Sequence, residues 1–286
     1  MARTKQEIEP APFTRWSGGK QRLVKKLQSM LPAEFGNYYE PFVGAGSLFY
    51  KVYAGRWSYI CDANEHLIAT YRAIKEAPDA LIILLDSYAD GREKRVEEGT
   101  EAVFYKRLQK VDRTGEIEFW SDVRKAARFM YLMKCGFNGI WRINQSQQHN
   151  TPMGDVENPN ICPRELIMAC SKALKQTMIV NGDYRFFECM AEQGDLVYFD
   201  PPYIPLGKAH SQYTPKPFGK TQTIELKWLC DRLSAKGVYF MLSNSYCETT
   251  LDLFKDYKIT EITTTRSVSC KADTRGKVKE IVVTNY

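Results

Sequence analysis

A long helical stretch between two groups of strand-like segments is the feature that most constrains the fold of this chain. The first group, "YYEPF" and "WSYICDAN", is separated by a glycine turn and a helix-like segment, an order typical of a βαβ unit. From about residue 66 to residue 163 the apolar residues have helical spacing. Strand-like segments return in "TMIVNGDY", "DLVYFDPPY" and "GVYFMLSNS". We therefore expect an α/β domain, residues 1–65 and 164–286, interrupted by a mainly helical insertion, residues 66–163.

The composition is that of a globular protein with reduced cysteines. Its 286 residues are 44% hydrophobic, enough for one large domain or for one domain that carries an insertion. Eight cysteines lack any C-x-x-C pair and the three histidines lack metal-binding spacing, so we expect neither disulfides nor a metal site. The longest aliphatic run, "ALIILL", is too short to cross a bilayer, and the polar start lacks an apolar signal core. We expect a cytoplasmic protein.

Basic residues are clustered in two places. The net charge is +6, and five Lys or Arg residues without any acid lie between residues 15 and 26. Five more lie in a predicted hairpin at residues 266–279, against the single acid Asp273. Each cluster is compatible with phosphate contacts on a nucleic acid, and equally with an ordinary solvated face.

A glycine turn follows the first predicted strand, in "EPFVGAGS". Gly44 and Gly46 let the backbone approach a ligand at the carboxyl edge of the sheet, where α/β folds bind ligands. Asp62 ends the next strand, where its carboxylate can accept both hydroxyl groups of a ribose. The spacing F-x-G-x-G differs from the dinucleotide-binding and P-loop motifs. The pattern indicates a nucleoside cofactor; the alternative is a glycine-rich connection with a helix-capping aspartate.

A second site is indicated by "VYFDPPY", where a β-forming run ends at an acidic residue. Pro201 and Pro202 cannot continue a ladder and fix the backbone directly after Asp200. Tyr203 is thereby held on a stiff support. This arrangement suits a flat ligand that forms hydrogen bonds, but a strand-ending turn with an exposed aspartate would have the same sequence.

The predicted insertion contains an unusual polar stretch at residues 129–154. It has no acidic residue, two cations (Lys134 and Arg142) and six side-chain amides. Arginine and amide side chains pair with guanine and adenine edges in the major groove of DNA. A loop that is merely rich in Asn and Gln would have the same composition, so this stretch alone does not decide its role.

Together these motifs resemble those of the S-adenosylmethionine-dependent amino-methyltransferases of DNA. "RWSGGK", the glycine turn, the helical segment and the later "DPPY" follow the order of the Dam-like DNA adenine N6-methyltransferases. "FNGIWRIN", "NTPMGD", "LSNS" and "TRGKVKEIVVTNY" are also similar to that family, most of all to GATC methylases of restriction–modification systems. The resemblance covers residues 13–286. It implies a Rossmann-like, seven-stranded mixed sheet whose last strand, "EIVVTNY", is antiparallel, and a helical target-recognition domain inserted after the second strand.

The resemblance also implies an S-adenosylmethionine site at the edge of this sheet. Lys20 would lie near the methionine carboxylate and Asp62 would hold the ribose. Asp183 would face the adenine amine of the cofactor. The cofactor-binding residues that we expect are Trp16, Lys20, Glu40, Phe42, Gly44, Gly46, Asp62, Asp183 and Asp200.

The same resemblance assigns the chemistry to Asp200, Pro201, Pro202 and Tyr203. An exocyclic adenine amine is a poor nucleophile because its lone pair is conjugated with the ring. Asp200 and the backbone carbonyl of Pro201 would each accept one N6 hydrogen, which directs the lone pair at the methyl group. Tyr203 would stack on an adenine that has left the duplex, and residues 207–220 would close over that base. We expect no covalent intermediate and no metal.

The polar stretch would then read the target sequence. Arg142 would contact a guanine, Pro152 a thymine methyl and Arg15 the first base pair, which implies a GATC site. The DNA-binding residues that we expect are Arg15, Phe137, Asn138, Ile140, Arg142, Asn144 and Pro152. Two positions depart from the family pattern, because His149 replaces an aromatic residue and Asp155 an arginine. An acid repels phosphate, which leaves the path of the DNA at this edge open.

We therefore expect a site-specific, adenine-specific DNA methyltransferase that acts as a monomer on double-stranded DNA and does not contact a membrane. By resemblance, a cognate restriction endonuclease would belong to the same system without forming a stable complex. The location would be the cytoplasm and nucleoid of a bacterial or phage-infected cell. Three alternatives remain open: methylation of cytosine N4, an RNA substrate, or a DNA-binding relative that has lost catalysis.

Overall fold

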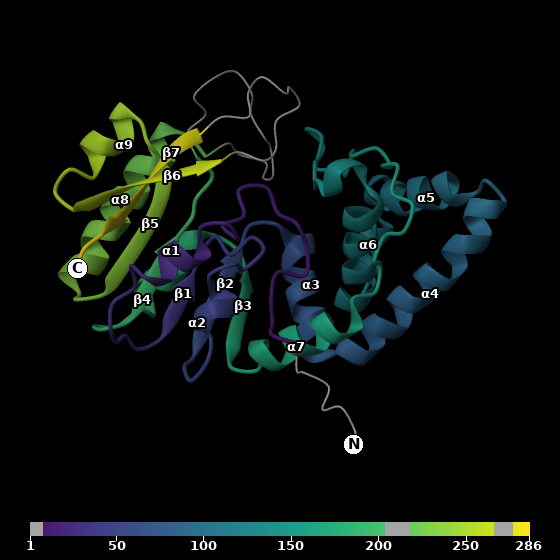
Figure 1. Cartoon of the computed structure of the whole chain (residues 1–286), viewed down its shortest axis with the longest axis horizontal. Helices are drawn as coiled ribbons and strands as arrows, with labels where there is room; N and C mark the ends of the chain where they lie inside the picture. Colours follow the sequence, from purple (N-terminus) through teal and green to yellow (C-terminus); the bar gives the residue numbers. More distant parts are fainter. Residues whose placement is uncertain (1–7, 204–217, 266–276) are drawn as a thin grey trace.

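The computed structural model describes residues 8–203, 218–265 and 277–286, which form a seven-stranded sheet in the order β3-β2-β1-β4-β5-β7-β6 (Figure 1). The strands are β1 (Tyr38–Glu40), β2 (Ser58–Asp62), β3 (Thr177–Asn181), β4 (Leu196–Phe199), β5 (Tyr239–Ser245), β6 (Lys258–Thr265) and β7 (Lys277–Thr284). Strands β1 to β5 are parallel, whereas β7 is antiparallel to both β5 and β6. The predicted α/β class, the seven-stranded sheet and its antiparallel last strand are confirmed.

Helices connect these strands. The α-helices are α1 (Val24–Gln28), α2 (Phe49–Val52), α3 (Glu65–Glu76), α4 (Pro78–Glu97), α5 (Glu101–Thr114), α6 (Asp122–Cys135), α7 (Arg164–Leu174), α8 (Lys220–Ala235) and α9 (Glu248–Leu253). The short 3-10 helices are η1 (Glu116–Phe119), η2 (Phe137–Gly139) and η3 (Tyr184–Cys189). Within the described ranges, no helix combines the length and the hydropathy that crossing a membrane requires. The two segments predicted to close over a base and to form a basic hairpin, residues 207–220 and 266–279, lie largely outside the described residues.

Side chains of the parallel strands alternate between two apolar cores. Tyr38 of β1 and Tyr198 of β4 belong to one core, and the residues that follow them, Tyr39 and Phe199, belong to the other. Leu229 of α8 packs in this second core. Since strand side chains alternate with a period of two, both faces of the sheet are covered, as is usual for parallel strands.

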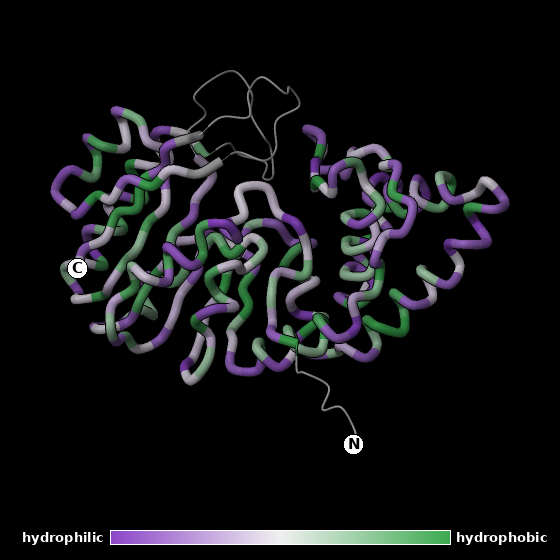
Figure 2. The backbone as a smooth tube through the Cα atoms, viewed as in Figure 1, coloured by the Kyte–Doolittle hydropathy of each residue, from purple (hydrophilic) through white to green (hydrophobic). Residues whose placement is uncertain are grey.

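Helix α3 is buried along most of its length because it lies between the sheet and the other helices of the middle segment. It contacts β2 and β3 on one side and α6 on the other. The side chain of Asn64 caps its start, accepting a hydrogen bond from the backbone N–H of Leu67 at 2.9 Å. Helices α4, α5 and α6 extend beyond α3, away from the strands (Figure 1). Figure 2 shows that α4 is hydrophobic where it begins, near α7, and hydrophilic at its outer end.

Candidate functional site

Three predicted site segments meet at the carboxyl edge of the parallel strands. The turn that contains Gly44 and Gly46 follows β1, Asp62 ends β2, and Asp200 follows β4. Strand β1 lies between β2 and β4, so the three segments are neighbours in space. Ligands of open α/β sheets bind at this edge.

Asp62 is tied to the glycine turn by its own carboxylate. Its Oδ2 accepts a hydrogen bond from the backbone N–H of Gly44 at 3.0 Å, and its Oδ1 accepts one from the N–H of Asn64 at 2.9 Å. Burial raises the pKa of Asp62, and these backbone hydrogen bonds act in the opposite direction. Each carboxylate oxygen keeps a second lone pair, so the side chain can still accept hydrogen bonds from the hydroxyl groups of a ribose.

The glycine turn has no room for side chains. Gly44 has φ +48° and Gly46 has φ +69°, and the N–H of Gly46 donates to the carbonyl of Val43 at 2.7 Å. A Cβ atom on Gly44 would lie 2.7 Å from Cδ1 of Trp16. A Cβ atom on Gly46 would lie 2.7 Å from the hydroxyl of Tyr71. The turn and Trp16 therefore pack tightly together, and we call this arrangement the cradle.

Asp200 is held by a lysine from the N-terminal segment. Nζ of Lys20 lies 2.8 Å from Oδ1 of Asp200 and also donates to the carbonyl of Gly18 at 3.0 Å. The side chains of Lys20 and Asp200 are only 7% and 17% exposed. Burial raises the pKa of Asp200 to about 6, although the Lys20 ammonium lowers it. Asp200 is therefore ionised at neutral pH and can act as a hydrogen-bond acceptor.

Tyr203 is fixed by Glu280, a residue that the sequence did not single out. The hydroxyl of Tyr203 donates to Oε2 of Glu280 at 2.9 Å, and Nζ of Lys20 lies 4.0 Å from the same oxygen. Lys20 also lies 4.7 Å from the centroid of the Tyr203 ring. Glu280 lies on β7, which places that strand in the site. Between Asp200 and Tyr203, Pro201 is buried and Pro202 is exposed.

Glu40 lies at the end of β1, close to Asp200. It is buried, and its Oε2 accepts a hydrogen bond from the hydroxyl of Tyr38 at 2.7 Å. Burial raises the pKa of Glu40 to about 8, with the nearby charge of Asp200 adding to the effect of burial. Glu40 is therefore mostly protonated at neutral pH, which leaves Asp200 as the charged carboxylate of the pair.

Phe42 and Asp183 lie on the side of the glycine turn that faces η3. The ring of Phe42 stacks on Tyr184 with 5.1 Å between centroids and meets Phe218 edge-on at 5.7 Å. Asp183 pairs with Arg185 through both carboxylate oxygens at 2.8 Å. The hydrogen bond from the Arg185 side chain lowers the pKa of Asp183. The predicted contact between Asp183 and a cofactor amine stays a prediction, since this carboxylate already has a cationic neighbour.

Residues 136–154 form a hairpin at the end of α6. Antiparallel bridges join Gly136 to Met153 and Ile143 to His149. The N–H of Phe137 donates to the carbonyl of Pro152 at 2.9 Å, and both of these residues are exposed. The hairpin therefore presents two of the predicted DNA-binding residues side by side at its base.

Other predicted DNA-binding residues of the hairpin differ in exposure. Asn138 is exposed and adopts φ +56°, a left-handed conformation that Asn tolerates. Ile140 is half-buried, and its carbonyl accepts a hydrogen bond from the Thr151 hydroxyl at 2.8 Å. Asn144 closes its own turn, because its Oδ1 accepts from the N–H groups of Ser146 and Gln148, each at 3.0 Å. This amide therefore has a structural task in the turn.

Arg142 is exposed and its guanidinium is oriented from within the hairpin. Nε donates to Oδ1 of Asn150 at 2.8 Å, and Nη2 donates to the backbone carbonyl of the same residue at 3.0 Å. Asn150 is one of the six side-chain amides at residues 129–154, and its sequence neighbours do not mark it as the partner of Arg142. The contact follows from the pairing of the hairpin, which brings Arg142 and Asn150, eight residues apart in the sequence, face to face.

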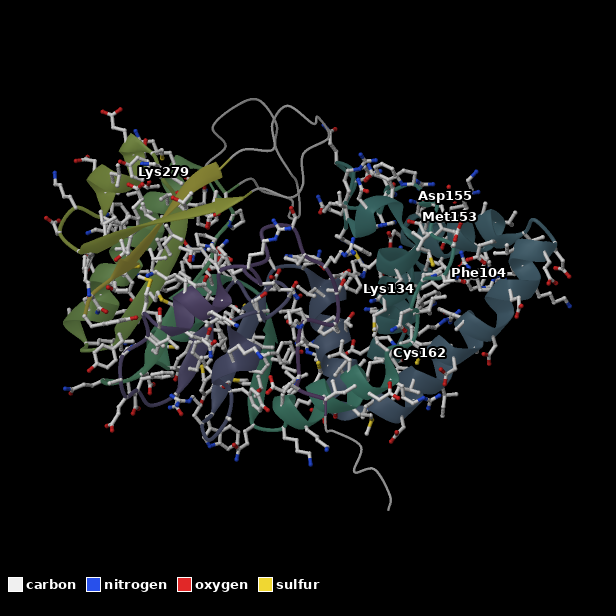
Figure 3. The ribbon with its side chains drawn as sticks, viewed as in Figure 1. Phe104, Lys134, Met153, Asp155, Cys162 and Lys279 are labelled. Carbon is white, nitrogen blue, oxygen red and sulfur yellow. The ribbon has the colours of Figure 1, made fainter. Side chains whose placement is uncertain are left out.

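Arg15 lies against the base of the hairpin. A Cβ atom on Gly139 would lie 3.6 Å from Cδ of Arg15. The pKa of Lys134, on α6, is lowered by burial and by the nearby charge of Arg15. Figure 3 shows Lys134 on α6, a little to the right of the centre of the molecule, and Lys279 on β7 at the left. Arg15, next to Trp16 of the cradle, thus connects the two predicted sites.

The two residues that depart from the family pattern lie in different environments. His149 is fully buried, and its ring lies 4.5 Å from that of Trp141. It is therefore a core residue of the hairpin. Asp155 is exposed, near Met153 at the end of the hairpin (Figure 3). Across the described ranges, no three His, Cys, Asp or Glu side chains are grouped closely enough to hold a metal ion.

A mixed seven-stranded sheet with a glycine turn after β1 and "DPPY" after β4 defines a methyltransferase of the S-adenosylmethionine-dependent class. The family model of D12 class N6 adenine-specific DNA methyltransferases matches residues 16–268, and the chain belongs to this family. The predicted family and the predicted activity, methylation of adenine in DNA, are confirmed.

Relatives of similar length support this assignment. The chain is 40% identical over 286 residues to "Type II methyltransferase M1.LlaDCHI" of Lactococcus lactis subsp. cremoris, covering 99% of this chain and 98% of the relative. It is 33% identical to "Type II methyltransferase M.MjaIII" of Methanocaldococcus jannaschii, covering 98% and 100%. It is 29% identical to a "DNA adenine methylase" of Salmonella typhi, covering 94% and 93%.

Proposed function

We propose that this adenine-specific DNA methyltransferase modifies a flipped adenine in GATC, using S-adenosylmethionine bound beside the glycine turn. The observation that carries the proposal is the position of Asp200. This ionised, largely buried carboxylate lies one strand away from the cradle of Gly44 and Trp16. A methyl acceptor held by Asp200 and a cofactor held by the cradle would therefore be neighbours.

The chain's own residues suit this cofactor. S-adenosylmethionine, when bound, supplies an electrophilic methyl group on its sulfonium sulfur, and S-adenosylhomocysteine is the product that leaves once the methyl group has moved to N6. The methylated nitrogen loses one proton, which Asp200 or water would accept. Asp62 would accept hydrogen bonds from the ribose, and the glycine turn would let the backbone approach the nucleoside. Phe42 offers an aromatic face for the adenine, with Asp183 near its amine. Lys20 would bind the methionine carboxylate, at the end of the cofactor that lies next to Asp200. Glu40 would lie close to the same end.

Asp200, Pro201 and Tyr203 would prepare the substrate amine. An ionised Asp200 accepts one N6 hydrogen and the Pro201 carbonyl accepts the other, which moves the nitrogen lone pair out of conjugation with the ring. The hydroxyl of Tyr203 is fixed by Glu280, so its ring would offer a stable stacking surface for a base outside the duplex. Lys20 forms an ion pair with Asp200, so the incoming amine would have to displace the Lys20 ammonium or share the carboxylate with it.

Residues 66–163 would form the target-recognition domain on the remaining α/β domain. The exposed side chains of Arg15, Phe137, Asn138, Arg142 and Pro152 support this assignment. Half-buried Ile140 would contact a base only through the part of its side chain that remains exposed. Asn144 would act by shaping the turn and not by touching a base.

The relatives named Type II methyltransferases support a role beside a restriction endonuclease that cuts the same site. We propose that the enzyme protects its host's DNA in this way without a stable complex. It would act as a monomer on the nucleoid, in the cytoplasm of a bacterial or phage-infected cell.

Methylation of unmethylated plasmid DNA tests the proposal. Purified protein and S-adenosylmethionine are incubated with the plasmid, and modified bases are mapped by single-molecule sequencing. N6-methyladenine confined to GATC would support both the chemistry and the recognition residues. Methyladenine in another motif would contradict the GATC assignment alone. N4-methylcytosine or an unmodified plasmid would contradict the proposed function.

A further inference from the structure

A buried ion pair lies beneath the hairpin of residues 136–154. Arg128 of α6 is fully buried, and its Nη2 lies 2.7 Å from Oδ2 of Asp112 on α5. Nε of Arg128 also donates to the carbonyl of Leu108 at 2.6 Å. The pair therefore joins the two helices on which the hairpin rests.

The same carboxylate holds the hairpin. Oδ2 of Asp112 accepts a second hydrogen bond, from the backbone N–H of His149 at 2.9 Å. Gln109, one turn earlier on α5, donates from Nε2 to the carbonyl of Thr151 at 2.8 Å. Both neighbours of Asn150 are thereby tied to α5.

Asn150 passes this restraint to Arg142. Its side-chain and backbone oxygens engage Nε and Nη2, which form one edge of the guanidinium. The other edge, Nη1 with Nη2, is the one that can bind O6 and N7 of a guanine. Because Arg142 is exposed, the restraint fixes which edge it presents outward.

We propose that Asp112, held by Arg128, is a positioning residue that sets the sequence selectivity of the enzyme through Asn150 and Arg142. This inference rests on the proposed role of Arg142 as the reader of a guanine. Asp112 touches neither substrate nor cofactor. It fixes the backbone on which the reading side chain is oriented.

Stability alone does not account for this pair. Among the described residues, Oδ1 of Asp112 and Nη1 of Arg128 are buried without a hydrogen-bond partner, as is Nε2 of His149. Buried ion pairs with unsatisfied atoms are often no more stable than apolar side chains of similar volume, whereas they can specify one arrangement. The geometry that the pair imposes on the hairpin is therefore its main contribution.

The double variant Asp112→Leu/Arg128→Met separates the two roles. It removes both charges and replaces them with apolar side chains. Because the N–H of His149 and the carbonyl of Leu108 lose their partners, we expect a folded protein with a melting temperature somewhat below that of the parent. We expect the ratio of kcat/KM on GATC to kcat/KM on sites with one changed outer base pair to fall about tenfold or more. The loss should be mainly in KM for DNA. The exposed pair of Arg164 and Asp86 offers a matched control, Asp86→Leu/Arg164→Met.

Two further variants keep the test decisive. Asn150→Ala removes the hydrogen bond from Nε of Arg142 and keeps the one from Nη2 to the backbone carbonyl, without touching the buried pair. It should reduce selectivity in the same direction if the double variant does not fold. In an Arg142→Ala background, neither change should reduce selectivity further, because both act through Arg142. Parental selectivity in the folded double variant, or in Asn150→Ala, would overturn the inference while leaving the role of Arg142 intact. Parental selectivity in Arg142→Ala alone would overturn that role and the inference with it.

Discussion

Lys20 and Asp200 form the central ion pair of the proposed active site, with 2.8 Å between Nζ and Oδ1. The lysine comes from the segment before α1 and the aspartate from the turn after β4. Its ammonium offsets part of the effect of burial on the carboxylate. The pair keeps Asp200 charged in a largely dry site, ready to accept a hydrogen bond from a substrate amine.

Replacing Asp200 by asparagine should abolish most of the activity. The substitution Asp200→Asn keeps the size of the side chain but removes the charge that draws on the adenine amine. We expect kcat to fall by about 10²–10³-fold, the usual cost of losing one oriented transition-state contact. Transfer of labelled methyl groups to a GATC duplex measures this. The exposed carboxylate change Asp252→Asn is the control, and equal activity of the two variants would contradict the mechanism.

The pH dependence of catalysis should follow the titration of Asp200. Its folded pKa of about 6 lies above the ordinary value, so kcat should decrease as the pH falls through about 6 and the carboxylate is protonated. Removing the ammonium in Lys20→Met takes away an influence that lowers this pKa. The acidic limb should therefore move to higher pH in that variant. A pH–rate profile at saturating S-adenosylmethionine and DNA measures both, and a limb that stays in place would contradict the assignment.

Tyr203 and Glu280 should act as one unit. Glu280→Ala removes the acceptor of the Tyr203 hydroxyl, and Tyr203→Phe removes the donor while keeping the ring. We expect each to reduce kcat/KM about tenfold, the value of one buried hydrogen bond to a charged group. The double variant should lose no more than either single variant. Losses that multiply would show that the two residues act separately.

The glycine cradle should tolerate no side chain. Gly44→Ala combines a positive φ with a Cβ atom 2.7 Å from Trp16, whereas Gly55→Ala has φ +76° and no atom within 4 Å. Both should lose about 1–2 kcal/mol of unfolding free energy to backbone strain. Gly44→Ala should lose about 1–3 kcal/mol more through crowding and should bind S-adenosylmethionine more weakly. Thermal unfolding and calorimetric titration measure these effects, and equal behaviour of the two variants would contradict the cradle.

The buried histidine should make stability depend on pH. Burial, with the nearby charges of Arg128, His66 and Arg142, lowers the pKa of His149 from 6.5 to about 3. The unfolded chain therefore binds a proton that the folded chain excludes, and stability is lost as the pH falls from about 6.5 to about 3. His149→Phe should remove about 2–3 kcal/mol of that loss at pH ~4. Urea unfolding of the parent and of His149→Phe at several pH values tests this. The same dependence of the unfolding free energy on pH in both proteins would contradict the prediction.

The sequence allowed the sheet to be predicted because its parallel strands are buried on both faces. Such strands are continuous apolar runs, as in the residues before Asp200, and their carboxyl ends carry the site motifs. Gly44 and Gly46 have the positive φ values that the turn required. These features are local in the sequence, and local patterns are what a single sequence reveals.

The contacts between distant segments could not be predicted in this way. Glu280 was one acid in a β-forming run, and only the placement of β7 between β5 and β6 brings it to Tyr203. Composition also could not show that Asn144 closes a turn while Asn150 orients an arginine. His149 was a departure from the aromatic residue of the family pattern, and its sequence neighbours did not show that the hairpin buries it against Trp141.

The position of β7 has a consequence for the synthesis of this enzyme. The sheet is finished only when β7, which follows β5 and β6 in the sequence, inserts between these two strands. Lys20, which is translated before the first strand of the sheet, then meets Glu280, which is translated after the other six strands. A nascent chain therefore contains Trp16 and the glycine turn before it can complete the contacts of Lys20 and Tyr203 with Glu280. Copies that end before β7 lack Glu280, and with it the acceptor that fixes the Tyr203 hydroxyl.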